Sequence, residues 1–273
     1  MKKVLSIIIE HLHEKKWLLL GFGFLIGIFG YGITLILEVL DLSELMDFFT
    51  AFPEFEELLD FFGDVASPYG LLNAEVFTFV WVFVGFFFVY IASSTVLPGE
   101  VEDKTIDLIL SKPISRSSYL MGKITFLYIF IIAVQAIIFT LIGVGMATSQ
   151  AFIDVGLHWD RLLAVYIINI VHSGTLVMTA LLFATITLSS KKTMGAALAI
   201  MFAMFFIGTI WGLFPEEQQF IKYVSTWFYM GIQDLFVHGV FDNFLQNFLV
   251  LLGINVCLII SSLFIFRRRD IPV

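Results

Sequence analysis

The sequence predicts an all-α membrane protein that crosses a bilayer six times. Of its 273 residues, 59% are hydrophobic and only 14% are charged, and the mean hydropathy is +0.97. A soluble domain is typically about 45–50% apolar and about 25% charged. This chain has too few polar groups to cover a soluble surface. It also contains six separate apolar runs, each near the length of about 20 residues that a helix needs to cross the hydrocarbon core.

The six expected spans belong to one transmembrane domain, residues 1–273. In chain order they cover residues 17–37, 76–97, 124–147, 162–188, 194–214 and 244–266. Before the first span, residues 1–16 place apolar side chains at helical spacing among lysines and histidines. This pattern predicts a helix that lies in the membrane interface.

Basic residues lie almost all on one side of these spans. If the N-terminus is cytosolic, six spans return the C-terminus to the cytosol, and 13 of the 15 Lys and Arg residues face inward. Only Arg161 and Lys222 then face outward. Cytoplasmic loops carry the excess of Lys and Arg. We therefore expect a multi-pass plasma-membrane protein with both termini in the cytosol.

The two longer segments on the outer side are acidic or aromatic. Residues 38–75 hold ten carboxylates and no Lys or Arg. Apolar stripes there predict short amphipathic surface helices, and the carboxylates lack the spacing of a Ca²⁺ loop. Residues 215–243 are too polar to span and too aromatic for a free loop. We expect short helices that dip into the outer leaflet, with residues 227–229 at the headgroup level.

The longest polar run on the cytosolic side covers residues 98–123. Within it, residues 102–110 predict a short amphipathic helix that begins at two acidic residues and stops before Pro113. Its apolar face consists of Ile106, Ile109 and Leu110. Ser115 can cap a second helix that leads into the third span. The exposed ridge can dock in a groove of another protein, although an ordinary interfacial loop explains the same pattern.

The residues of this run also follow a known pattern. They read EVEDKTI from Glu100, LILSKPISR from Leu108 and GK from Gly122, and the chain closes on FRRRD from Phe266. This arrangement resembles ABC-2-type permeases, the membrane subunits of type V ABC transporters. Lys104 stands where that family usually has Gly. In its compact size the chain is similar to the permeases of single-permease systems for copper-centre maturation, bacitracin resistance and lantibiotic immunity.

The resemblance implies a dimer in which each permease copy binds one cytosolic ATPase, and the ATPase holds ATP and Mg²⁺. The segment near residues 102–110 is then the coupling helix. The implied docking residues are Glu100, Glu102, Thr105, Ile106, Ile109, Leu110, Pro113 and Arg116. In the family, spans one and five lie near the dimer interface. Small residues that permit close helix contact occur in both spans: Gly23, Gly27, Gly195, Ala199 and Ala203.

The chemistry of the spans favours a transporter driven by a partner. The sequence has no GxxxxGK[ST] loop, so this chain does not bind ATP by that route. Asn169 and His172 share a face in the fourth span and are either a polar site or an interhelical hydrogen-bonding pair. Because the spans offer no polar route, we expect a lipid, an amphipathic peptide or a drug-like substrate. Membrane lipid is the expected surrounding partner, and nucleic acid is not expected.

Two other classes of protein remain open from the sequence. Asp103 and Asp107 form a DxxxD pair, the kind of carboxylate pair that holds Mg²⁺ on a diphosphate in intramembrane prenyltransferases. That class normally carries a second acidic motif on the same side, and this sequence has none. A membrane scaffold that senses ATPase state without transporting a substrate is the other alternative. The expected role is therefore a permease with no catalytic residue and no metal site of its own.

Overall fold

A computed structural model describes residues 2–39, 67–104 and 115–269 of the chain. Every regular element in these ranges is a helix, and six helical segments are long and apolar enough to cross a membrane. The six segments are α1 (Lys2–Ile36); the run of α4 (Pro68–Leu72), η2 (Asn73–Val80), α5 (Trp81–Thr95) and α6 (Leu97–Glu102); α8 (Arg116–Thr148); α10 (Trp159–Thr187); α11 (Ser190–Ile210) with η3 (Trp211–Leu213); and α12 (Phe244–Arg268). The predicted fold class, an all-α polytopic membrane protein, is confirmed.

Short helices join these segments at the end of the bundle away from α6. They are α9 (Gln150–Val155), η4 (Glu216–Val224), η5 (Phe228–Met230) and η6 (Gln233–His238). The short helices predicted for residues 215–243 are therefore present. The amphipathic surface helices predicted within residues 38–75 fall mainly on 40–66, which lie outside the described residues.

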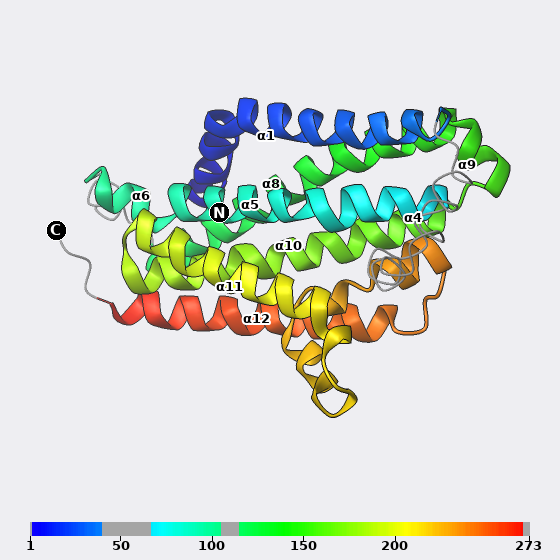
Figure 1. Ribbon diagram of the computed structural model, residues 1–273. Coiled ribbons are helices and arrows are strands. Elements are labelled where there is room, and N and C mark those ends of the chain that lie inside the picture. The colour runs from blue at the N-terminus through cyan, green and yellow to red at the C-terminus, as the bar shows by residue number, and fades with distance from the viewer. Residues whose placement is uncertain (1, 40–66, 105–114, 270–273) are drawn as a thin grey trace.

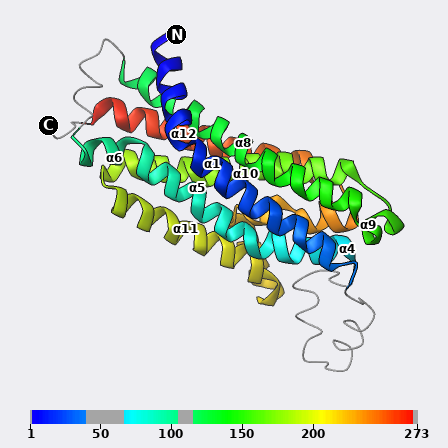
Figure 2. The ribbon, with the colours of Figure 1, turned by 90° about the horizontal axis from the view of Figure 1, so that it is seen from above.

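Two element boundaries differ from the prediction. The interfacial helix and the first span form one continuous helix, α1, whose N-terminal part turns away from the direction of the rest (Figures 1 and 2). The second membrane segment begins at Pro68 instead of residue 76. Pro68 occupies the first helical turn, and the Ser67 hydroxyl accepts a hydrogen bond of 2.9 Å from the Gly70 amide, so α4 is capped at its start.

The predicted cap of α8 is confirmed. Ser115 precedes the helix in an extended conformation, and its hydroxyl oxygen accepts a hydrogen bond of 3.2 Å from the amide of Ser118. A serine in this position satisfies one of the amide groups that have no partner in the first helical turn. The cap fixes where the polar segment ends and the third span begins.

Helix α10 lies at the centre of the bundle and packs against α5, α8, α11 and α12, while α1 lies along α8 (Figures 1 and 2). The close approach of α1 to α8 depends on small residues. A Cβ atom added to Gly27 would lie 2.6 Å from a methyl carbon of Leu141, and one on Gly23 would lie 3.2 Å from Ile137. Both glycines therefore face α8 of the same chain.

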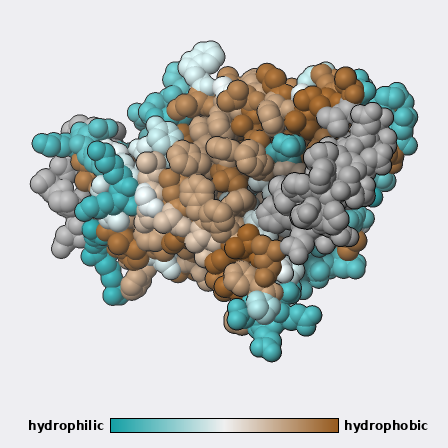
Figure 3. Space-filling model, in the orientation of Figure 1, coloured by the Kyte–Doolittle hydropathy of each residue, from teal (hydrophilic) through white to brown (hydrophobic). Residues whose placement is uncertain are grey.

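The surface of the bundle has the distribution of polarity that a bilayer requires. Hydrophobic side chains cover much of its middle, and hydrophilic ones gather toward the two ends (Figure 3). Large apolar side chains are exposed on the outer helices, among them Phe24, Phe206, Leu249 and Phe264. Such a surface is stable only when lipid or another protein covers it.

The aromatic segment between α11 and α12 packs into the bundle. The Ser225 hydroxyl donates a hydrogen bond of 2.5 Å to the Met204 carbonyl, and the Trp227 indole lies 4.4 Å from the His172 ring, centroid to centroid. A Cβ atom on Gly208 would lie 2.6 Å from Trp227 Cβ, so the glycine admits this contact. Trp227 thus faces the bundle interior, and its position at the headgroup level stays a prediction.

Candidate functional site

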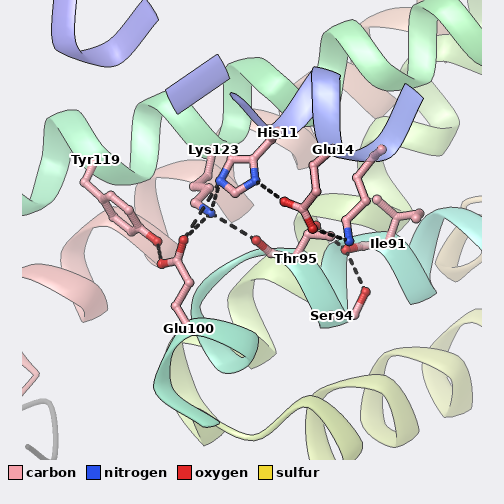
Figure 4. A network of polar contacts seen from close by, with 9 residues as sticks. His11, Glu14, Ile91, Ser94, Thr95, Glu100, Tyr119 and Lys123 are labelled. Carbon is pink, nitrogen blue, oxygen red and sulfur yellow. Dashed lines mark hydrogen bonds and ion pairs between the residues drawn. The ribbon is translucent and has the colours of Figure 1, made fainter. Parts of the chain in front are cut away.

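A fully buried lysine marks the site at the α6 end of the bundle. Lys123, in the second turn of α8, has 0% of its side chain exposed. Its ammonium group lies 2.6 Å from Glu100 Oε1, 3.0 Å from the Thr95 carbonyl oxygen and 2.5 Å from His11 Nε2 (Figure 4). Three separate helices, α1, α5 and α6, therefore supply the partners of one charge. A buried ammonium needs such partners because an unpaired charge in this position is very costly.

Glu100 is the counter-charge, and both of its oxygens are in use. One oxygen accepts from Lys123, and the other accepts from the Tyr119 hydroxyl, which lies one turn earlier on α8. Only 13% of the Glu100 side chain is exposed. Lys123 and Glu100 stand near opposite ends of the polar run in the sequence, and the fold closes that run by pairing them. We call these two residues, with Tyr119 and His11, the ion clasp.

The interruption of helical structure between α5 and α6 provides the third partner of the Lys123 ammonium group. Val96 has a non-helical conformation, φ −90° and ψ −126°, and separates the two helices. The last carbonyls of a helix have no partner within it, and Lys123 fills this role for the Thr95 carbonyl. Pro98 lies at the start of α6, where its missing amide hydrogen costs nothing.

His11 connects the N-terminal part of α1 to the clasp. A lysine ammonium can only donate, so His11 Nε2 accepts from it and the imidazole is neutral with its proton on Nδ1. Nδ1 lies 3.5 Å from Glu14 Oε2, and Glu14 in turn lies 2.8 Å from the Lys15 ammonium at the exposed edge. The predicted interfacial segment is therefore attached to α8 by a specific polar contact.

The other side of α6 contacts α11. The Glu102 carboxylate accepts a hydrogen bond of 2.9 Å from the amide of Ser190, the first residue of α11. A carboxylate is favourable there because a helix N-terminus carries partial positive charge. Glu100 and Glu102 thus connect one short helix to both sides of the bundle.

Helix α6 ends in a left-handed backbone conformation at Lys104. Asp103 follows the helix, and Lys104 has φ +55°, the left-handed region that glycine adopts without steric cost. The Lys104 amide donates a hydrogen bond of 3.2 Å to the Val101 carbonyl, as in a common helix C-terminal motif. The predicted helix start at Glu102 is wrong, because Glu102 is the last residue of α6.

Three of the eight predicted docking residues lie in the described part of the chain, and all three have partners within it. Glu100 pairs with Lys123, Glu102 caps α11, and the Arg116 guanidinium donates a hydrogen bond of 2.6 Å to the Arg269 carbonyl. The other five lie outside the described residues: Thr105, Ile106, Ile109, Leu110 and Pro113. Of the DxxxD pair, Asp103 is exposed in the turn after α6, and Asp107 also lies outside them.

The C-terminal arginines close the same end of the bundle. Arg267 Nε donates a hydrogen bond of 2.5 Å to the Ser117 hydroxyl, and Arg269 donates one of 3.0 Å to the Thr185 carbonyl. Together with Arg116, they connect the ends of α8, α10 and α12. The C-terminal arginines therefore hold the ends of these helices together by hydrogen bonds.

The intramembrane polar pair does not form a shared site within the described residues. His172 and Asn169 are both fully buried. His172 Nε2 lies 3.4 Å from the Thr226 hydroxyl, whereas the Asn169 amide donates to the Val165 carbonyl of its own helix at 2.9 Å. Both alternatives stay open, because Asn169 Oδ1 and His172 Nδ1 have no hydrogen-bond partner among the described residues.

The small residues of the two predicted interface helices have different surroundings. Gly23 and Gly27 are buried against α8, so the assignment of these two glycines to a dimer interface is wrong. On α11, by contrast, Gly195, Ala199 and Ala203 are exposed, and a Cβ on Gly195 would meet no atom within 4 Å. The α11 residues stay candidates for contact with a second copy.

The ion clasp is the functional feature that sequence reasoning missed. The lysine at 123 was visible as part of the GK pair, at the edge of an apolar run, where an unpaired charge would be costly. Its partner could not be named, because Glu100, Asp103 and Asp107 are all close in sequence. Only the break at Val96 and the turn of α6 select Glu100.

The fold and the clasp together define a class of protein: a polytopic helical membrane protein in which a buried ion pair, Lys123 with Glu100, joins the two ends of a polar segment to the spans. In the described residues no group of three or more metal-binding side chains accompanies it. The sequence matches the family model described as "ABC-2 family transporter protein" over residues 13–271. The chain belongs to that family. Comparison with curated proteins gives no match.

Proposed function

We propose that this chain is the permease subunit of an ABC exporter, driven by a separate cytosolic ATPase that docks near residues 102–110. Family membership supports the transport class. The observation that carries the proposal is the ion clasp, because it joins the last helix before that segment to α1 and α8. A pull on the segment then moves three membrane helices, since Glu102 also connects α6 to α11.

The proposed substrate is hydrophobic or amphipathic. Some polar side chains inside the bundle bond to each other: Gln135 donates to the Ser173 hydroxyl at 2.7 Å, and Asn255 donates to the Thr175 hydroxyl at 2.8 Å. Such bonds between helices stabilise the bundle. A lipid, an amphipathic peptide or a drug-like compound suits helices of this kind.

The proposed assembly places two copies in the plasma membrane with both termini in the cytosol. The basic residues at the α6 end support this orientation. ATP and Mg²⁺ would bind to the partner ATPase, and this chain would carry no catalytic group.

Docking can be tested by changing the predicted apolar ridge. The double variant Ile106→Glu/Ile109→Glu is expected to insert normally but to lose co-purification with an ABC ATPase of the same genome, or to uncouple ATP hydrolysis from transport. The matched control places two glutamates at the opposite end of the bundle, at the exposed Phe220 and Val224 of η4. Normal assembly and coupling in the ridge variant would reject the docking model. ATPase stimulation by a transported substrate distinguishes an exporter from a scaffold.

A further inference from the structure

A cavity lies at the end of the bundle away from α6, between three elements. Its walls come from η2, from the end of α11 with η3, and from the segment that contains η5 and η6. Its volume is about 790 Å³, within the range of small-molecule sites in proteins. One wall is the Trp227 indole, which also contacts the rings of His172 and Phe205. The cavity therefore borders the polar interior of α10.

Two hydrogen-bond acceptors, Asn73 and Asp234, line the cavity beside donors such as the indole N–H of Trp227, which has no partner among the described residues. Asn73 is only 4% exposed, and its side-chain oxygen has no hydrogen-bond partner among the described residues. A buried acceptor without a partner is costly unless a ligand or a water supplies the donor. Asp234 is the one charged residue among the described residues that line this cavity. These two acceptors favour a headgroup that donates hydrogen bonds and carries positive charge.

The aromatic lining favours the same kind of ligand. Trp211, Trp227 and Phe228 all border the cavity. Two of these rings already attract an ammonium group, since Lys222 Nζ lies 4.2 Å from the Trp211 ring centroid and 5.3 Å from that of Phe228. Aromatic faces attract cations, most strongly when the cation is shielded from water. The remaining lining includes apolar side chains, such as Met230 and Ile232, which suit a hydrocarbon chain.

We propose that this cavity binds an amphiphile with a primary ammonium headgroup, the nitrogen directed to Asn73 and Asp234 and the chain lying against the aromatic and apolar walls. The proposal rests on the proposed permease function for its biological meaning, because it names the substrate class. A primary amine fits better than a quaternary one, because only the former can donate hydrogen bonds to the two acceptors. An anionic headgroup would lie beside the Asp234 carboxylate, which repels it.

The test uses the purified full chain in nanodiscs of zwitterionic lipid, without any ATPase. Octylammonium, octyltrimethylammonium and octyl sulfate are titrated in turn, and binding is followed by tryptophan fluorescence with empty nanodiscs as the blank. Octylammonium is expected to bind most tightly and octyl sulfate most weakly. Equal affinity for octylammonium and octyl sulfate would overturn the proposal.

Variants locate the site. Asp234→Asn, an exposed position, is expected to weaken octylammonium binding about tenfold, the loss typical of a charge-assisted hydrogen bond. Asp242→Asn removes the same charge from the same outer segment but outside the cavity lining, and should leave affinity unchanged. Equal effects of the two changes would contradict the site. Since no ATPase is present, failure here leaves the permease role intact, and failure of ATPase docking leaves this binding result intact.

Discussion

Lys123 carries a charge that is stable in the folded protein only with a buried partner of opposite charge. It is fully buried, and Glu100 is the only carboxylate among its hydrogen-bond partners in the described structure. Removing one member of a buried ion pair typically costs about 3–5 kcal/mol, because the other charge stays desolvated. Replacing Lys123 or Glu100 alone should therefore destabilise the folded protein much more than replacing both charges together.

Glu100→Gln is accordingly expected to lower the free energy of unfolding by about 3–5 kcal/mol, measured by thermal or denaturant unfolding in detergent. The double variant Glu100→Gln/Lys123→Met should regain a large part of that loss, because no buried charge is left. Glu14→Gln is the matched control: Glu14 pairs with Lys15 at the exposed edge, where such a pair contributes about 0.2–1 kcal/mol, and a glutamine oxygen can still accept from His11 Nδ1. A loss at Glu14 as large as that at Glu100 would contradict the clasp.

Lys104 carries backbone strain that glycine would relieve. A non-glycine residue in the left-handed region destabilises the folded state by about 1–2 kcal/mol. Glycine removes this strain, but its greater freedom in the unfolded chain offsets part of the gain. Lys104→Gly is expected to raise the free energy of unfolding by about 0.4–1 kcal/mol. Lys104→Ala removes the charge but keeps the strain, so it should give no gain. A stabilisation by alanine equal to that by glycine would show that charge, not conformation, matters here.

At the scale of elements, the sequence was informative wherever a local signal decided the outcome. Apolar run length found the six membrane segments, and Ser115 marked the start of α8 because a cap depends only on its own turn. Helix α6 was missed for the opposite reason. Its six residues contain Pro98 and Gly99, which resemble a loop, and the contacts of Glu100 and Glu102 with distant helices hold it in place.

The glycines of α1 show a second limit of local information. The spacing of Gly23 and Gly27 indicates that a helix approaches closely, but the sequence does not say which helix. The structure places α8 there, and side chains at both positions would collide with Ile137 and Leu141. The apolar ridge at Ile106 and Ile109 stays a prediction, since it lies outside the described residues.

Across the whole molecule, the six membrane segments are buried to very different extents within the chain. The apolar windows of α11 and α12 are the least buried of the six membrane segments within the chain, whereas α10 is surrounded. Lipid can cover such faces. On α11, however, small residues repeat every four positions on the exposed side, which allows the backbones of two helices to approach. We therefore expect a two-fold contact in which α11 meets α11 of a second copy, because a symmetric dimer uses the same patch on both subunits.

Cysteine cross-linking can decide whether α11 is that contact. In a Cys257→Ser background, which removes the only cysteine of the chain, Ala199→Cys is expected to give a covalent dimer on oxidation in native membranes. A disulfide needs Cα atoms within about 7 Å, so only a close and symmetric contact permits it. Val256→Cys on the exposed side of α12 is the control and should stay monomeric. Cross-linking at Val256 without any at Ala199 would place the interface on α12, and α11 would then face lipid.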